Sequence, residues 1–313
     1  MDMSASVVLP DGWQDSVRAA LAESPRPELA DGGLRLLGAG MDSVALMLES
    51  DGGEYVLRLP QDPHGAEGIA HEQRLLPELA PCLPVPIPQF LFTAPNPLGP
   101  GRFCAYPAVP GESLSEEQWR ARGLLDRPAI HRRIAESLAG VHAFPADRAR
   151  ELGIRIWDLR GEFGDDLKTV RAEVVPLLDR SDAALLLAAW ERYLDDDANF
   201  AHEPTLIHAD VSLDHLLVTG SELTGLIDFG DVAIADPDYD LCYLYPEAGR
   251  EFVDRVLRCR GTELTPRTET KLRFWACADP ALDVLHAQEH EMPEFQQERL
   301  LVLTEALARY QNR

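Results

Sequence analysis

Two acidic motifs separated by a predicted hairpin constrain this chain more than any other feature of its sequence. Residues 208–210 read His-Ala-Asp, with His215 a short way beyond them, and residues 228–230 read Asp-Phe-Gly. Two apolar runs between the motifs, 216–218 and 223–227, read as strands, and the Thr-Gly-Ser-Glu sequence that joins them is typical of a tight turn. A hairpin here returns the chain to the edge where it started. We therefore expect both motifs and His215 to share one small volume.

The residues of these motifs suit phosphoryl transfer. This chemistry needs a carboxylate that orients a hydroxyl and accepts its proton, for which Asp210 is the candidate. It also needs ligands for a Mg²⁺ ion that neutralises the triphosphate, for which His215 and Asp228 are the candidates. Protein kinases place H-R-D-x-x-x-x-N before D-F-G, and this chain keeps that order and spacing with histidine in place of asparagine. A polar loop beside an ordinary hairpin is the alternative, and the joint pattern disfavours it.

The same stretch resembles the aminoglycoside phosphotransferase family of antibiotic kinases, and most closely its 2''-phosphotransferases. Their loop reads H-x-D-x-S-x-x-H, which Ser212 and His215 match. The segment after their D-F-G is matched by Asp231 and by the acidic run 236–240. Macrolide phosphotransferases, which also place histidine where most kinases have asparagine, are the next most similar group.

The resemblance implies a role for each residue of the two motifs. It implies transfer of the γ-phosphate of ATP or GTP with Mg²⁺ as the cofactor. Asp210 would be the catalytic residue, and His215 and Asp228 would hold the metal. His208 and Ser212 would support the loop.

The resemblance also implies an α+β, protein-kinase-like fold with two lobes. Residue patterns agree with it, because alternation predicts strands over 33–37, 44–48 and 54–60, and helical spacing predicts helices over 12–23, 65–80, 248–259, 264–289 and 292–312. The change from strands to long helices falls at 106–110. We expect a nucleotide-binding N-lobe at residues 1–107, an antiparallel sheet with one helix. A mostly helical C-lobe, residues 108–313, would carry the catalytic and substrate-binding groups.

Nucleotide phosphates are predicted to meet a glycine-containing loop and an arginine. Gly38, Gly40 and Ser43 lie in a tight turn between two strands, where the backbone could approach phosphates and the Ser43 hydroxyl could donate to one. Arg58 lies on the third strand, at the position where kinases have the phosphate-binding lysine. Glu72, on the following helix, is the candidate that fixes Arg58, with Glu67 and Glu78 as alternatives. A surface strand arginine and a solvated helix glutamate remain the simpler explanations.

The nucleotide base is predicted to bind at the hinge between the lobes. By resemblance, Tyr106 is the gatekeeper, the carbonyl of Pro107 accepts from the base, and the amide of Val109 donates to it. Pro107 has no amide hydrogen, so only its carbonyl is available.

Four residues fall where the family forms its substrate cleft. These are Glu247, Trp275, Asp279 and Asp283. Each of them is more often a surface or core residue than a ligand, so the assignment rests on the resemblance alone.

Charge favours a cationic substrate over nucleic acid. Asp plus Glu number 53 against 29 Lys plus Arg, a net charge of −24. Phosphate backbones need basic faces, whereas an acidic cleft concentrates polycations, although acidity also serves solubility alone. We expect no membrane partner, since no apolar run is long enough to span one and the N-terminus lacks the basic start of a signal peptide. Five scattered cysteines without a metal-binding spacing fit a reducing cytoplasm.

The predicted function is phosphorylation of a hydroxyl on a cationic antibiotic, an aminoglycoside first of all, which would confer resistance. A macrolide 2'-phosphotransferase is the nearest alternative, since Arg58 and His215 suit it. A kinase acting on a choline-like or amino-alcohol metabolite is a further one. The last alternative is a nucleotide-binding protein without catalysis. It is suggested by His215 in place of the asparagine of protein kinases and by Arg58 in place of their lysine. The choice between ATP and GTP, and between a monomer and a homodimer, stays open.

Overall fold

The computed structural model describes residues 9–40 and 42–311. Residues 1–8, where we predict that a signal peptide is absent, lie outside the described residues. So does Met41, which belongs to the predicted phosphate loop. Among the described residues, no helix is both long and apolar enough to cross a membrane.

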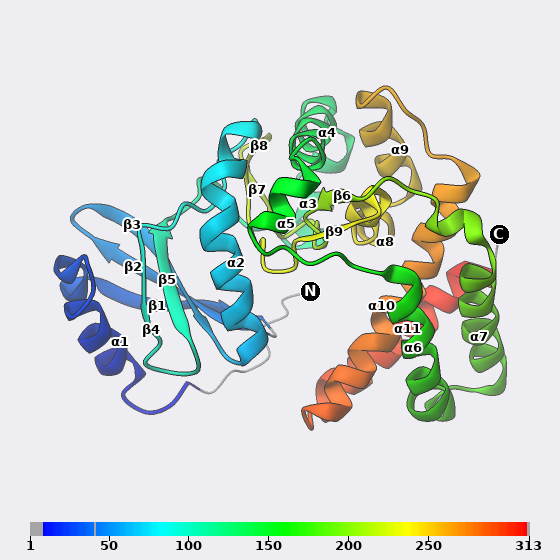
Figure 1. Cartoon of the computed structure of the whole chain (residues 1–313), viewed down its shortest axis with the longest axis horizontal. Helices are drawn as coiled ribbons and strands as arrows, with labels where there is room; N and C mark the ends of the chain where they lie inside the picture. Colours follow the sequence, from blue (N-terminus) through cyan, green and yellow to red (C-terminus); the bar gives the residue numbers. More distant parts are fainter. Residues whose placement is uncertain (1–8, 41, 312–313) are drawn as a thin grey trace.

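The first lobe is built on a five-stranded antiparallel sheet with the strand order β1-β2-β3-β5-β4 (Figure 1). Its strands are β1 (Gly33–Ala39), β2 (Ser43–Ser50), β3 (Gly53–Pro60), β4 (Phe92–Pro95) and β5 (Arg102–Pro107). Strands β2 and β3 meet at a tight turn where Gly53 has φ of 117°, a conformation that favours glycine. The three strands predicted from alternation are therefore confirmed.

Two helices cover the two faces of this sheet, where a single helix was expected. Helix α1 (Trp13–Ala22) packs its buried Val17 and Leu21 on the face that carries the inward side chains of β2 and β3. Helix α2 (Pro63–Leu79) lies on the opposite face, between the sheet and the second lobe (Figure 1), and packs Ile69 there. The Asp62 carboxylate caps α2 by accepting from the Gly65 amide at 2.8 Å. The alternation of β3 thus sends Arg58 towards α2 and the second lobe.

The chain leaves β5 at Pro107, where the lobe boundary is predicted, and fastens at once to a hairpin of the second lobe. That hairpin is β7 (Leu216–Thr219) with β8 (Glu222–Leu226). Glu112 and Val218 exchange two backbone hydrogen bonds, of 2.9 and 3.0 Å. A Cβ on Gly225 would lie 2.4 Å from a Val109 methyl, so only glycine allows the hinge segment to lie against the hairpin. The boundary itself stays a prediction.

The second lobe is mostly helical around one large apolar core. Its helices are α3 (Glu116–Ala121), α4 (Pro128–His142), α5 (Ala146–Glu151), α6 (Leu159–Thr169), α7 (Arg180–Asp195), α8 (Leu244–Ala248), α9 (Arg250–Cys259), α10 (Pro266–Glu289) and α11 (Pro293–Gln311). A short ribbon of β6 (Thr205–Ile207) and β9 (Ala233–Ala235) runs through it, and Ile156 bridges to Ile234 beside β9. The three helices predicted between 248 and 312 are present. All five cysteines are free.

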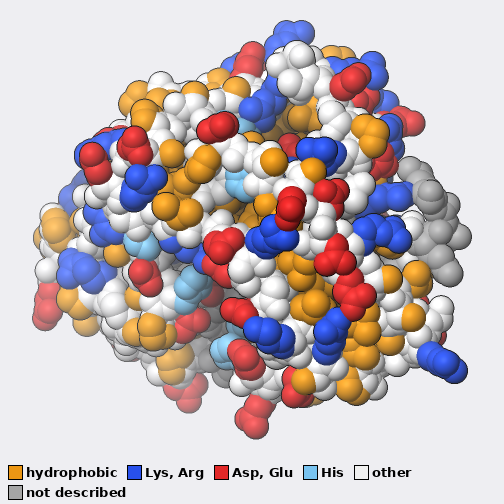
Figure 2. Space-filling model, turned by 45° about the vertical axis from the view of Figure 1, so that its right-hand side comes forward, with side chains coloured by type: hydrophobic (Ala, Val, Ile, Leu, Met, Phe, Trp, Pro, Cys, Tyr) orange, Lys and Arg blue, Asp and Glu red, His pale blue; other side chains and the backbone are white. Residues whose placement is uncertain are grey.

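The surface charges are mixed on the face shown in Figure 2. Acidic and basic side chains are interspersed there, with apolar side chains gathered between them in places. The large net negative charge therefore does not form one continuous acidic field on this face.

Candidate active site

The acidic loop, which we define as residues 208–215, follows β6 and is fastened at its start by Asp240. The buried Asp240 carboxylate accepts hydrogen bonds from the backbone amides of His208, at 3.3 Å, and Ala209, at 2.7 Å. Ala209 has φ of 69°, a left-handed conformation that costs free energy in any residue but glycine. Hydrogen bonds to a charged acceptor are stronger than neutral ones, so one carboxylate holds this strained backbone in place.

Two further side chains shape the loop from within. His208 is fully buried, its Nε2 donates to the Ile227 carbonyl at 3.0 Å, and its Nδ1 accepts from the Asp210 amide at 3.3 Å. Burial lowers the pKa of His208 to about 4, so the ring is neutral, as one donating and one accepting nitrogen require. The Ser212 hydroxyl donates to the Asp214 carboxylate at 2.6 Å.

Asp210, His215 and Asp228 converge, as the hairpin predicts. His215 Nδ1 lies 2.9 Å from the Asp210 carbonyl oxygen and 3.3 Å from its carboxylate. His215 Nε2 lies 3.6 Å from the Asp228 carboxylate. One oxygen or nitrogen from each residue lies within 4.8 Å of the others. Two carboxylates and an imidazole at this spacing form a donor set that fits a divalent cation.

The charges of this group are mutually dependent. Burial opposes protonation of His215, but the carboxylates of Asp210 and Asp228 outweigh it and raise the pKa of the imidazole. Burial raises the pKa of Asp210, and His215 opposes that rise. Burial would also raise the pKa of Asp228, but the positive charges of Arg58 and His215 lower it below its ordinary value. Asp228 is thus the group of the three held most firmly as an anion.

Arg58 connects the first lobe to this group. Its Nη1 lies 2.7 and 2.8 Å from the two carboxylate oxygens of Glu72, which is fully buried, and its Nη2 lies 3.1 Å from Asp228. The structure therefore pairs Arg58 with Glu72 and not with Glu67, which lies beside His71, or Glu78, which pairs with Arg148. The simpler explanations from sequence, a surface arginine and a solvated glutamate, do not hold.

The residues predicted to meet the phosphates and the base belong to the first lobe and the hinge. In the loop between β1 and β2, the Gly40 amide donates to the Ser43 carbonyl at 3.0 Å. A Cβ on Gly38 would meet no atom within 4 Å, so local packing does not require glycine there. At the hinge, Tyr106 is buried and stacks on Phe90, with 5.7 Å between ring centroids. Pro107 ends β5 and Val109 packs against the cluster that contains Tyr106.

The four predicted substrate residues are placed differently from one another. The Glu247 carboxylate accepts from the Leu213 amide at 2.8 Å, and burial raises its pKa to about 8. Asp279 accepts from the Tyr239 hydroxyl at 3.2 Å. Asp283 lies 3.6 Å from Arg299. Trp275 is fully buried, so it packs in the core beneath the site and does not reach its surface. Glu247 thus contacts the acidic loop, and the other three belong to α10.

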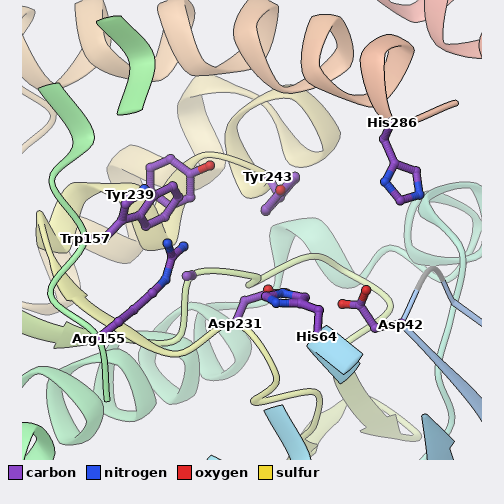
Figure 3. A pocket seen from close by; sticks show the side chains of 9 residues that line it. Asp42, His64, Arg155, Trp157, Asp231, Tyr239, Tyr243 and His286 are labelled. Atoms are coloured by element: carbon purple, nitrogen blue, oxygen red, sulfur yellow. The ribbon is translucent and has the colours of Figure 1, made fainter. Parts of the chain in front are cut away.

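A pocket of about 290 Å³ opens beside the acidic loop (Figure 3). Arg155 and Trp157 stand on one side, Asp42 and His286 on the other, and Ala209 of the acidic loop also lines it. The lining is completed by Asp231, His64, Tyr239 and Tyr243. The pocket therefore joins the reactive group to a wall that is partly aromatic and partly charged.

Sequence reasoning missed most of this lining. Asp231 was noticed only as a match to a motif. Arg155 and Trp157 follow a strand-like alternation, since the Trp157 amide bonds the Ile234 carbonyl and the Ile234 amide bonds the Arg155 carbonyl, at 2.9 and 2.8 Å. The guanidinium of Arg155 lies over the Trp157 ring at 4.8 Å from its centroid. The signal was the apolar-polar-apolar alternation of 154–156, which the apolar Trp157 interrupts and which is too short to stand out.

A second group of donor atoms lies at the mouth of this pocket. Asp42, His64 and Asp231 each place one carboxylate oxygen or ring nitrogen within 4.8 Å of the others. They come from the loop before β2, the first turn of α2 and the segment after D-F-G. The tight packing of Gly65, whose Cβ would lie 2.2 Å from the Asp42 carbonyl oxygen, holds the first two elements together.

Comparison with known proteins identifies the family of this chain. The sequence profile of the phosphotransferase enzyme family (APH) matches residues 33–275, which include the glycine loop, both acidic motifs and the first part of α10. The chain belongs to this family. Its assignment confirms the resemblance and, with the structural neighbours below, the kinase-like α+β fold.

Among solved structures, an APH(2'') enzyme in complex with GDP and kanamycin is 28% identical, with a TM-score of 0.85 over 94% of this chain and 98% of that one. A macrolide 2'-phosphotransferase from Brachybacterium faecium is 25% identical, with a TM-score of 0.72 over 94% and 98%. A homoserine kinase of Methylobacterium nodulans is 30% identical over 61% of this chain and only 56% of its own length. The family is thus shared by relatives with different acceptors.

Proposed function

We propose that this phosphotransferase moves the γ-phosphate of ATP or GTP to a hydroxyl of a cationic antibiotic, with aminoglycosides as the first acceptor class. The observation that carries the proposal is the convergence of Asp210, His215 and Asp228 beside a pocket lined by the same acidic loop. The similarity to an APH(2'') enzyme that binds GDP and kanamycin supports the acceptor class and the nucleotide.

In this mechanism the protein positions groups and supplies charge. Asp210 orients the acceptor hydroxyl and accepts its proton as the oxygen attacks the γ-phosphorus and the nucleoside diphosphate leaves with the bridging oxygen. His215 and Asp228 would hold Mg²⁺, which supplies charge neutralisation of the triphosphate when bound. Arg58, oriented by Glu72, would bind the phosphates. Arg58 Nη2 also donates to Asp228 at 3.1 Å, so phosphates and this carboxylate would share one guanidinium.

The remaining assignments follow from the same proposal. Gly38, Gly40 and Ser43 would approach the phosphates, and Tyr106, Pro107 and Val109 would border the base in the hinge between lobes 1–107 and 108–313. We place the reaction in the cytoplasm, where nucleoside triphosphates are available and the five free thiols stay reduced.

A second candidate function is favoured by one observation at the pocket. Arg155 is the one Lys or Arg side chain in the described pocket lining, and it extends towards the cavity (Figure 3). A guanidinium repels a polycation and binds a carboxylate, so it suits a small amino alcohol that carries an acid group. The match to a homoserine kinase agrees with this second candidate. The charged lining argues against a macrolide, which needs an apolar cleft.

The test is release of nucleoside diphosphate with Mg²⁺, from ATP and GTP separately. The acceptor panel holds kanamycin, gentamicin, streptomycin, hygromycin, erythromycin, choline and homoserine. Release stimulated by an aminoglycoside supports the first function, and stimulation by homoserine alone supports the second. Stimulation by choline alone would contradict the role given to Arg155, because choline carries no acid group. Stimulation by erythromycin alone would move the chain to the macrolide kinases. Nucleotide binding without any stimulated release would contradict both proposals.

A further inference from the structure

One face of α10 contacts the short segment 236–240 through several of its side chains. Lys271, Trp275 and Asp279 are spaced four apart, so they form one stripe along the helix. Trp275 packs against the Tyr239 ring at 4.9 Å between centroids, and Asp279 accepts from the Tyr239 hydroxyl. We call residues 236–240, which this stripe contacts, the connecting segment.

Lys271 makes the strongest of these contacts. Its ammonium lies 2.6 Å from the Asp236 carboxylate and 2.7 Å from the Asp238 carboxylate, and its side chain is 7% exposed. The side chains of its partners are 2% and 27% exposed. The chain has two lysines in all, and the other, Lys168, is 77% exposed. A buried lysine in a chain that otherwise uses arginine marks a site where a compact three-proton donor is needed.

The other end of the connecting segment holds the acidic loop. Asp240 accepts from the amides of His208 and Ala209, which directly precede Asp210, and from His142 Nε2 at 2.8 Å. The backbone of the connecting segment therefore joins the ion pairs of Lys271 on α10 to the hydrogen bonds that hold the backbone beside Asp210.

We propose that Lys271 is a positioning residue, which fixes the acidic loop, and with it Asp210, relative to α10. The proposal rests on the proposed function, in which Asp210 receives the acceptor proton and α10 borders the acceptor pocket. Lys271 itself touches neither nucleotide nor acceptor in this account. Lys271 fixes the position of the Asp210 carboxylate, which activates the acceptor, relative to α10, which borders the acceptor.

The electrostatics explain why this contact controls the segment. Without the ammonium, the carboxylates of Asp236 and Asp238 would repel each other in a largely buried place. Asp236 also accepts from the Asp238 amide at 3.0 Å, which starts the turn over 237–241. Repulsion would therefore open this turn and move Asp240, which lies within it. An arginine would keep the charge, but its wider planar fork does not match two oxygens that converge on one nitrogen.

The experiment compares Lys271→Met and Lys271→Arg with Lys168→Met as the matched control. Hydrogen exchange of the full chain is followed in the peptides that cover residues 205–212. The kcat and the nucleotide KM are measured with whichever acceptor of the panel stimulates release of nucleoside diphosphate. We expect Lys271→Met to increase exchange in these peptides and to lower kcat at least tenfold, with the nucleotide KM changed less than threefold. Lys271→Arg should recover part of both losses, and Lys168→Met should match the wild type.

Two outcomes would overturn the proposal. One is unchanged exchange at 205–212 together with wild-type kcat in Lys271→Met. The other is faster exchange spread evenly over both lobes, which would assign Lys271 to general stability. If Lys271→Met does not fold, Lys271→Gln, which removes the charge but keeps a hydrogen-bond donor, replaces it with the same expected pattern. Hydrogen exchange needs no acceptor, so it decides the role of Lys271 even if the proposed function fails.

Discussion

The acidic loop with its hairpin and the wall of the pocket border the same site. The residues of the loop and hairpin are close together in the sequence, whereas the residues of the wall are far apart. Asp210 and His215 are five residues apart, and a hairpin of about a dozen residues brings Asp228 to them. The wall of the pocket is assembled from Arg155, from Tyr239 and from His286, which lie far apart in the sequence. Reactive groups are thus encoded locally, whereas the acceptor wall depends on how distant elements pack.

This difference separates what the family shares from what varies within it. A local motif survives any change in the surrounding helices that preserves the hairpin. A wall built from separate elements changes with each of them. The relatives fit this division, since an aminoglycoside, a macrolide and a homoserine kinase share the family but not the acceptor.

The largest effect should come from the acidic loop. We expect Asp210→Ala to lower kcat roughly 10²- to 10⁴-fold, because it removes the group that accepts the hydroxyl proton. Nucleotide affinity, measured by titration with a fluorescent nucleoside diphosphate, should stay within a few fold of the wild type. Retention of most of the activity would show that the reactive group lies elsewhere.

The next effect concerns the cation that joins the first lobe to the loop. Glu72→Gln should destabilise the protein by about 3–5 kcal/mol and weaken nucleotide binding, because it leaves the buried Arg58 without its carboxylate. The matched control is Glu49→Gln, which breaks the exposed pair with Arg35 and should cost less than about 1 kcal/mol. Denaturant unfolding measures both. Equal losses in the free energy of unfolding for the two variants would show that the buried pair contributes no more than the exposed one.

A pH test probes the α10 side. Burial, with Asp283 nearby, raises the pKa of Asp279 from 3.8 to about 8. The folded protein therefore binds this proton more tightly than the unfolded chain does, and wild-type stability relative to Asp279→Asn should fall as pH rises from about 4 towards about 8. Melting temperatures of both proteins at pH 5 and pH 9 measure the difference. A difference that does not depend on pH would mean that Asp279 is already ionised in the folded state.

The smallest effect should distinguish acceptors. Arg155→Ala should change KM only a few fold, and in opposite directions for the two proposed acceptor classes. Removal of the guanidinium should lower KM for a polycation and raise it for an acceptor that bears a carboxylate. Arg160→Ala, which changes an arginine outside the described pocket lining, is the control. A change of the same sign for kanamycin and homoserine would show that Arg155 does not read acceptor charge.

Sequence alone predicted the parts that depend on short-range patterns. Periodicity located the first three strands and α2, and spacing brought Asp210, His215 and Asp228 together, because a hairpin links them. The face of Trp275 on α10 was not predictable, since whether a helix residue meets solvent or core depends on its packing partners. The same limit applies to Arg155. Its place in the pocket wall depends on the backbone hydrogen bonds that join 155–157 to Ile234 of β9.

The most direct test of the account is the identity of the reaction product. The wild type and Asp210→Ala are each incubated with Mg²⁺, ATP or GTP and the acceptor that stimulates nucleotide turnover, and the acceptor is analysed by ³¹P NMR. The account predicts a new phosphate monoester on an acceptor hydroxyl with the wild type and none with the variant at equal protein concentration. An ester formed equally by the variant, or release of inorganic phosphate with no phosphorylated acceptor, would contradict it.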